Sequence, residues 1–121
     1  MRFNRPLAFA AVAEAATGIG LIVAPSVVGR LLSGDELSGV ALHMARVAGI
    51  ALLSLGVACW PGQSPSRSMI RGMTVYSAFA AAYLAYLGVR AVWAGPLLWP
   101  AVVAHGILTF LLLRTAGAKA G

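Results

Sequence analysis

Four side chains that could do chemistry lie inside apolar stretches of this sequence: Glu14, Arg46, Tyr83 and His105. Placing an ionisable group inside a membrane costs about 2.5–3.5 kcal/mol on insertion scales, so each such group is a candidate functional residue. A carboxyl group and an imidazole in this setting could pair with one another, exchange a proton or bind a ligand. The interpretation depends on which helices bring these side chains together.

The composition indicates that those helices lie in a membrane. The chain has 121 residues, of which 60% are hydrophobic and 10% are charged, and its mean hydropathy is +0.89. Soluble domains are typically about 25% charged, and a membrane-spanning helix needs about 20 mostly apolar residues. We therefore expect one all-α integral membrane domain over residues 1–121, with spans at about residues 7–24, 40–60, 69–93 and 97–114.

The connections between these spans are short, which predicts an up-down four-helix bundle. Segment 25–39 is amphipathic and suits a position at the membrane interface. Ser38, or Asp35 with its acidic neighbour Glu36, is expected to cap the helix that follows.

The basic residues predict the orientation of the bundle. The formal net charge of +6 would suggest nucleic acid in a soluble chain, but here the basic residues stand singly between apolar spans, so no nucleic-acid partner is expected. More of them fall on the side of the termini than on the opposite side, and the positive-inside rule then puts both termini in the cytoplasm of a bacterial inner membrane. The residues on the side of the termini are Arg2, Arg5, Arg67, Arg71, Arg114 and Lys119, and those on the opposite side are Arg30, Arg46 and Arg90.

The rise of a helix gives the depth of each candidate residue. Glu14 lies about 10 Å and His105 about 13 Å from the same membrane edge, whereas Tyr83 and Arg46 lie at about 21 Å. We therefore expect Glu14 to pair with His105 or with the long side chain of Arg46. Three interpretations stay open: a structural pair that fixes helix register, a proton-linked or ligand-binding site, and a carboxyl group that faces a partner chain.

Aromatic residues form a second candidate feature. Tyr76, Phe79, Tyr83 and Tyr86 follow one another at heptad-like spacing. Because hydroxyl groups in lipid need partners, this face is expected to look into the bundle or at another subunit. The alternative is a flat lining for an aromatic or quinone-like ligand.

Other chemistry is not indicated by the sequence. The single cysteine, Cys59, is expected to be a small apolar core residue. His43 and His105 come out at different heights, so no shared haem is expected, and no metal site is expected either because no helix carries ligands at suitable spacing. The sequence contains no nucleophile elbow, phosphate loop or Cys-x-x-Cys. We therefore expect no catalytic activity and no bound cofactor.

Two segments carry a resemblance to a known family. They are ARVAGIALLSLGVACWP, residues 45–61, and GPLLWPAVVAHGILTFLL, residues 95–112. With Arg46-x-x-Gly49 before a Leu/Gly run, the chain resembles the small bacterial four-helix membrane proteins grouped around the DoxX-like families. The resemblance implies a four-helix inner-membrane protein that serves in some cases as an accessory subunit, and it implies no reaction.

Two functions therefore follow from the sequence as expectations. The first is a non-catalytic subunit of a homo-oligomer or of a larger membrane assembly, because small residues recur at four-residue spacing and let helices approach closely. These residues are Ala16 and Gly20, then Ala41, Ala45 and Gly49, then Ser77, Ala81 and Ala85. The alternative is a proton-coupled transporter of small hydrophobic or cationic compounds that uses Glu14.

Overall fold

The computed structural model describes residues 3–120 of the chain, and these form five helices. They are α1 (Arg5–Val23), α2 (Pro25–Ser33), α3 (Val40–Ala58), α4 (Arg67–Val89) and α5 (Leu98–Ala120). By length and composition, α1, α3, α4 and residues Leu98–Ala118 of α5 could each cross a membrane. The four expected spans are therefore present as helices. The fifth helix, α2, lies within the connection expected between the first two spans.

Local sequence explains where the long helices begin and end. Asn4 caps α1, because its side-chain oxygen accepts a hydrogen bond from the Leu7 N–H at 3.0 Å, and Ser66 caps α4 in the same way through the Met69 N–H at 3.2 Å. The expected cap of α3 is wrong: its N-cap is Gly39, which makes no side-chain hydrogen bond. Glu36 instead pairs with Arg30 on the surface.

The third expected span ends at Val89 rather than Trp93 because a Schellman motif closes α4. The N–H of Val92 donates to the Leu87 carbonyl at 3.0 Å, and that of Ala91 donates to the Gly88 carbonyl at 3.1 Å. This closure requires a left-handed residue, and Ala91 has φ 55°. At the other end of the chain, α5 continues past Arg114 through an alanine-rich segment that favours helix.

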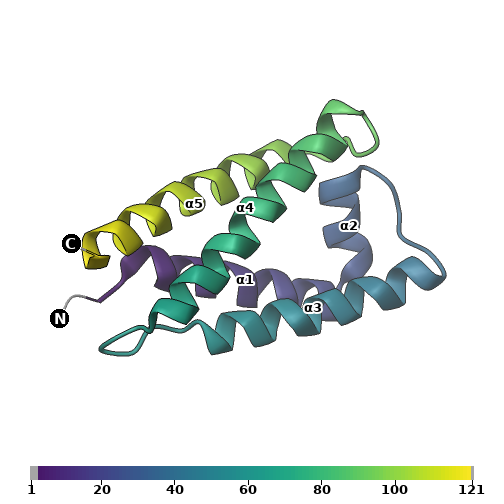
Figure 1. The fold of residues 1–121 in the computed structure, drawn as a ribbon. Helices are drawn as coiled ribbons and strands as arrows, with labels where there is room; N and C mark the ends of the chain where they lie inside the picture. The colour runs from purple at the N-terminus through teal and green to yellow at the C-terminus, as the bar shows by residue number, and fades with distance from the viewer. Residues whose placement is uncertain (1–2, 121) are drawn as a thin grey trace.

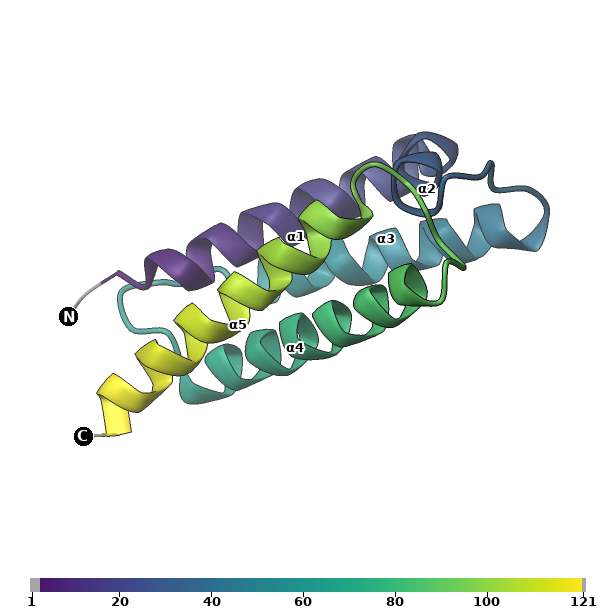
Figure 2. The same cartoon turned by 90° about the horizontal axis from the view of Figure 1, so that it is seen from above.

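The helices pack as two hairpins. α1 packs mainly on α3, and α4 packs mainly on α5, as Figures 1 and 2 show. Glycines let α1 and α3 approach closely: a Cβ added to Gly18 would lie 2.5 Å from the Gly49 carbonyl oxygen, and one added to Gly56 would lie 2.6 Å from that of Ala11. This close backbone contact is the packing that small residues provide in membrane bundles. Of the expected stripe on α3, Gly49 takes part in it and Ala41 is exposed.

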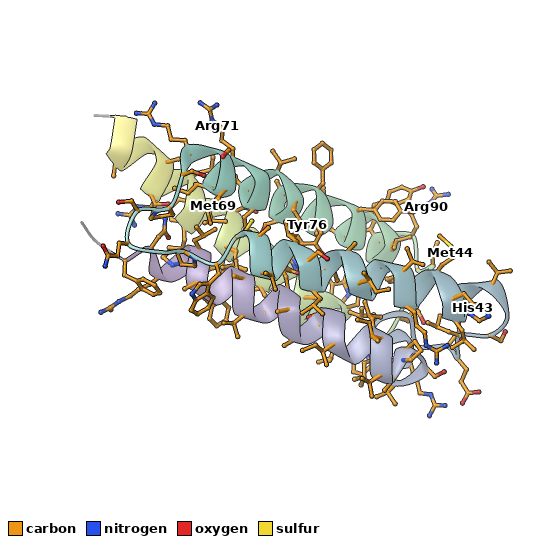
Figure 3. The ribbon with its side chains drawn as sticks, turned by 90° about the horizontal axis from the view of Figure 1, so that it is seen from below. His43, Met44, Met69, Arg71, Tyr76 and Arg90 are labelled. Carbon is orange, nitrogen blue, oxygen red and sulfur yellow. The ribbon has the colours of Figure 1, made fainter. Side chains whose placement is uncertain are left out.

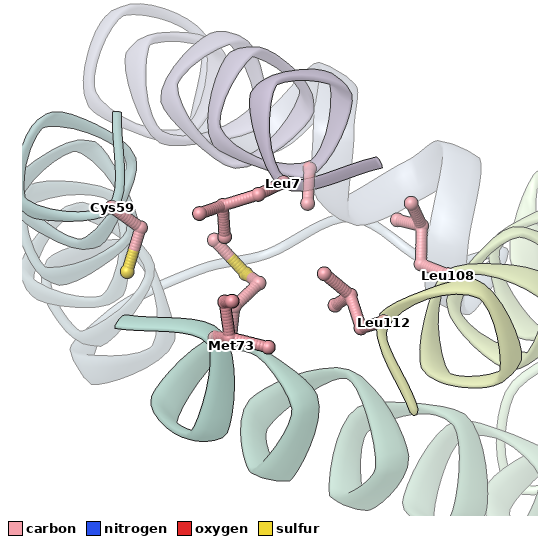
Figure 4. Packing of buried hydrophobic residues seen from close by; sticks show 7 residues of the cluster. Leu7, Cys59, Met73, Leu108 and Leu112 are labelled. Carbon is pink, nitrogen blue, oxygen red and sulfur yellow. The ribbon is translucent and has the colours of Figure 1, made fainter. Parts of the chain in front are cut away.

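An apolar core joins the two hairpins at the end of the bundle that holds both termini (Figures 1 and 4). It includes Cys59, which is buried as predicted, and its thiol donates to the Met69 carbonyl at 3.9 Å. Arg2, one of the residues counted toward the orientation, lies outside the described residues, as does the side chain of Lys119. The members of this core are Leu7, Ala10, Cys59, Ile70, Met73, Leu108 and Leu112.

The helix α2 joins the hairpins at the opposite end (Figure 1). Its last carbonyl groups accept hydrogen bonds from the α4–α5 connection: Ser33 from Ala94 at 2.9 Å, Leu32 from Gly95 at 3.1 Å and Leu31 from Leu97 at 2.8 Å. Carbonyls at a helix end need such donors. The approach is close enough that a Cβ on Gly95 would overlap the Leu31 backbone. Segment 25–33 is thus an amphipathic helix held between the hairpins.

Candidate functional site

The candidate site is built on one contact between the two hairpins, the pair of Glu14 on α1 and His105 on α5. The Nε2 atom of His105 lies 3.1 Å from Oε1 of Glu14. Glu14 is 3% exposed and His105 is partly buried. The contact expected from the two helical depths is therefore present.

A second hydrogen bond decides how protons are arranged in this pair. Nδ1 of His105 lies 2.7 Å from the carbonyl oxygen of Ala101. A carbonyl oxygen only accepts, so Nδ1 carries the proton and donates it. Nε2 and Oε1 then share one further proton, which makes either a carboxylic acid beside a neutral imidazole or a carboxylate beside an imidazolium. Both arrangements hold the same number of protons and have no net charge.

Tyr76 on α4 completes the polar group. Its ring meets the His105 ring edge-on, with 5.9 Å between centroids and 65° between planes, which places Tyr76 beside the Glu14–His105 pair. Figure 3 shows Tyr76 near the middle of the bundle, with Arg71 towards one end and Arg90 towards the other. The polar group of Glu14, Tyr76 and His105 thus draws on three of the long helices.

The remaining aromatic residues of α4 do not all share this face. Tyr76 and Tyr83 line a cavity between the two hairpins. Tyr83 is nevertheless 63% exposed, and it stacks on Tyr86 with 6.1 Å between ring centroids. Phe79 and Tyr86 are exposed on the outer surface and do not contribute to the cavity. The predicted single stripe is therefore divided: Tyr76 and Tyr83 line the cavity, and Phe79 and Tyr86 do not.

Arg46 does not join the pair. Its Nε atom donates to the carbonyl oxygen of Ile22, 3.3 Å away near the end of α1. A guanidinium at that position satisfies a carbonyl that the helix leaves without an internal partner. Of the two partners expected for Glu14, the structure shows His105 and not Arg46.

A cavity of about 720 Å³ opens between the hairpins on the α2 side of the polar group. We call it the inter-hairpin cavity. Its walls are mostly apolar, and α2 closes part of it with Val28, Leu31 and Leu32. These α2 residues were missed as site residues, and the amphipathic pattern of segment 25–39 is the signal that could have found them. The long helices contribute Glu14, Ala16, Thr17, Gly20, Leu21, Leu52, Tyr76, Ala80, Tyr83, Leu84, Pro100, Ala101, Ala104 and His105, and the α4–α5 connection contributes Trp93 and Leu97.

Other histidines and metal ligands do not extend the site. His43 is exposed near the start of α3 (Figure 3), at the end of the bundle away from the termini. Within residues 3–120, no group of three or more His, Cys, Asp or Glu side chains could hold a metal ion. The chemistry available in the inter-hairpin cavity is therefore hydrogen bonding and proton exchange at Glu14 and His105, beside a largely apolar wall.

No protein-family model matches this chain, and neither a curated protein nor a solved structure matches it.

Proposed function

We propose that this protein is a multi-pass membrane protein that binds a small, largely apolar molecule in the inter-hairpin cavity. The observation that carries the proposal is the coincidence of this cavity with the Glu14–His105 pair. Ligand sites are typically concave, about 300–1,000 Å³ in volume, mostly apolar and furnished with a few convergent polar groups. A cavity of about 720 Å³ with one polar group fits each of these features.

We place α1, α3, α4 and α5 across a bacterial inner membrane with both termini in the cytoplasm. Arg5, Arg67, Arg71 and Arg114 support this orientation, since they belong to helix ends on the side of the termini, and basic residues favour the cytoplasmic side. Fusion of a reporter that is active only in the cytoplasm to the C-terminus tests it. Activity of a reporter that works only in the periplasm, fused at the same position, would show that the C-terminus lies outside the cytoplasm and would contradict this orientation.

A role as a subunit of an assembly is the second candidate function. It is favoured by a groove of about 550 Å³ on the outer surface of α1 and α3, where small residues lie between larger apolar ones. Small residues on a lipid-facing surface allow another helix to approach closely. Proton-coupled transport through Glu14 remains a further hypothesis, and it requires a second state that opens the apolar core at the end with the termini.

The proposed binding can be measured by quenching of Trp93, which lines the inter-hairpin cavity. With Trp60→Phe and Trp99→Phe, Trp93 is the only tryptophan of the chain. The protein in lipid nanodiscs is titrated with 8-bromo-1-octanol, whose bromine quenches tryptophan at contact. We expect a saturable component of quenching, in addition to the linear component that partition into lipid produces.

Matched variants on α4 localise that component. Ala80 lines the cavity, and Ala80→Phe should remove the saturable quenching by placing a phenyl ring where the probe binds. Ala82 is exposed on the same helix, outside the cavity lining, so Ala82→Phe should leave the titration unchanged. Quenching that never saturates, or that survives Ala80→Phe, would contradict the proposed function.

A further inference from the structure

The polar group of the inter-hairpin cavity lies at one end of it. On α1 the lining runs from Glu14 to Leu21, and on α5 from Pro100 to His105. On both helices the polar residue is therefore the lining residue nearest the termini, beyond which the apolar core begins. The helical rise makes the α1 wall about 10 Å long. A molecule in this cavity thus meets the Glu14–His105 pair at one end and mostly apolar side chains along the rest of its length, where Thr17 and Tyr83 also carry hydroxyl groups.

The far end of the cavity is apolar and aromatic. There α2 contributes Leu31 and Leu32, and the α4–α5 connection contributes Trp93 and Leu97. These two segments are joined by backbone hydrogen bonds, so the wall is a defined surface. It offers dispersion contacts and an aromatic face, and the carbonyl groups of Leu31 and Leu32 already accept hydrogen bonds from the α4–α5 connection.

The balance of charge in the cavity selects against an ionic ligand. The Glu14–His105 pair has no net charge in either arrangement of its shared proton. Among the described residues that line the cavity, these two are the only ones with an acidic or basic side chain apart from the tyrosine phenols. The arginines at the α2 end of the bundle, Arg30, Arg46 and Arg90, do not line the cavity; Arg30 pairs with Glu36, and Arg46 donates to the Ile22 carbonyl. A charged ligand would enter this low-dielectric space without a counter-ion, which is costly.

We propose that the occupant is a neutral molecule with one hydrogen-bonding group, such as an alcohol, and an apolar body about 10 Å long. It binds with its polar group at Glu14 and His105 and its apolar end against Trp93 and α2. This inference rests on the proposed function and adds the chemical class of the ligand and its direction in the cavity. The Glu14–His105 pair suits a hydroxyl group because a carboxyl oxygen of Glu14 can accept its hydrogen bond, while both nitrogens of His105 are already engaged.

The test compares four probes of one length in the single-tryptophan protein. They are 8-bromo-1-octanol, 1-bromooctane, 8-bromooctanoate and 8-bromooctylammonium, at neutral pH in nanodiscs. Partition of each probe into empty nanodiscs is measured first, so that half-saturation is expressed as concentration in the bilayer. We expect the alcohol to saturate Trp93 quenching at a concentration at least about tenfold lower than either ion, because an ion loses its hydration without gaining a counter-ion.

The polar end is tested by removing it. In the parent protein, the alcohol should saturate Trp93 quenching at a lower bilayer concentration than 1-bromooctane. In the Glu14→Leu/His105→Leu variant, both probes should still saturate the quenching, but at similar concentrations. Glu36→Leu, an acidic position outside the cavity, is the control and should change neither curve. If this double variant does not fold, Glu14→Gln/His105→Gln replaces it. That variant should reduce the difference between the half-saturation concentrations of the alcohol and 1-bromooctane.

The outcomes separate the two proposals. An ion that binds as tightly as the alcohol or more tightly, with saturable quenching that Ala80→Phe removes, would contradict the inference that the ligand is neutral. The proposed function, ligand binding in the cavity, would still stand. An unchanged preference for the alcohol without the polar pair would overturn the assigned direction. If no probe gives a saturable signal that Ala80→Phe removes, the proposed function itself fails.

Discussion

Oε1 of Glu14 and Nε2 of His105 lie 3.1 Å apart although 91 residues separate them in the chain. The contact links the α1–α3 hairpin to the α4–α5 hairpin at the boundary between the apolar core and the inter-hairpin cavity. The proton shared by Glu14 and His105 therefore affects both the stability of the bundle and the chemistry of the cavity.

Removal of the Glu14 carboxyl group should destabilise the bundle. In Glu14→Leu, Nε2 of the partly buried His105 loses its partner, and an unmet buried hydrogen bond costs about 1–3 kcal/mol. Glu14→Gln should retain most of the stability, because its amide can donate to Nε2 while Nδ1 stays bound to Ala101. Unfolding by SDS in mixed micelles measures both free energies.

The double variant Glu14→Leu/His105→Leu provides the control for that prediction. Replacing both members of a buried pair with apolar residues is often neutral, so it should recover much of the stability that Glu14→Leu loses. Equal stability of Glu14→Leu and the parent protein would show that the pair does not hold the hairpins together.

The close contact of α1 and α3 predicts that alanine substitutions at two glycines, Gly49 and Gly72, will have opposite effects on stability. In Gly49→Ala, the new Cβ would lie 2.6 Å from the Gly18 carbonyl oxygen, so the helices must separate. Overpacking of this kind costs about 1–3 kcal/mol. A Cβ added to Gly72 would meet no atom within 4 Å, and Gly72→Ala should be neutral or stabilising through helix propensity. Thermal unfolding followed by circular dichroism compares the two, and equal losses would argue against backbone contact.

The left-handed residue that ends α4 predicts a stabilising substitution. Ala91 has φ 55°, and a residue with a Cβ pays about 1–2 kcal/mol for that conformation. Ala91→Gly should therefore raise the melting temperature. Ala94→Gly is the matched control in the same connection: without a positive φ, it should lower stability slightly through the added freedom of the unfolded chain. A lower melting temperature for Ala91→Gly would contradict the Schellman closure.

The pH dependence of Cys59 follows from its burial. Burial raises the pKa of the Cys59 thiol, so less thiolate is present at any given pH and alkylation is slower. The rate with iodoacetamide should reach half its maximum above about pH 8.5, the usual thiol pKa. The control is Gln63→Cys in a Cys59→Ser background, since residue 63 is exposed. Mass spectrometry across pH 7–10 follows both rates, and matching profiles would contradict burial of Cys59.

The long helices could be predicted from the sequence because each is an apolar run of about the length that crosses a bilayer. The contact of Glu14 with His105 could be predicted as well, since a fixed rise of 1.5 Å per residue determines the depth of a side chain once the edge of its helix is known. The partner of Arg46 could not be predicted, because the flexible side chain of Arg46 can reach several acceptors. The nearest suitable one is a backbone carbonyl that composition does not reveal.

The division of the aromatic stripe also has a geometric cause. Successive helical residues are turned by about 100°, so Phe79 lies about 60° away from Tyr76, whereas Tyr83 lies within about 20° of it. Residues at this heptad-like spacing therefore lie on two adjacent faces of α4, although the spacing predicted a single one. The place of α2 was beyond prediction for a different reason. Its carbonyl groups are satisfied by N–H groups of the α4–α5 connection, some 60 residues later in the chain.

The most direct test of the account is the position of a bromine atom in a crystal structure of the protein with 8-bromo-1-octanol. Anomalous scattering identifies bromine independently of the lipid around it. We predict one peak inside the inter-hairpin cavity, at the end formed by Trp93, Leu31 and Leu97. Peaks only on the outer surface, for example in the groove beside Trp60, would contradict binding between the hairpins.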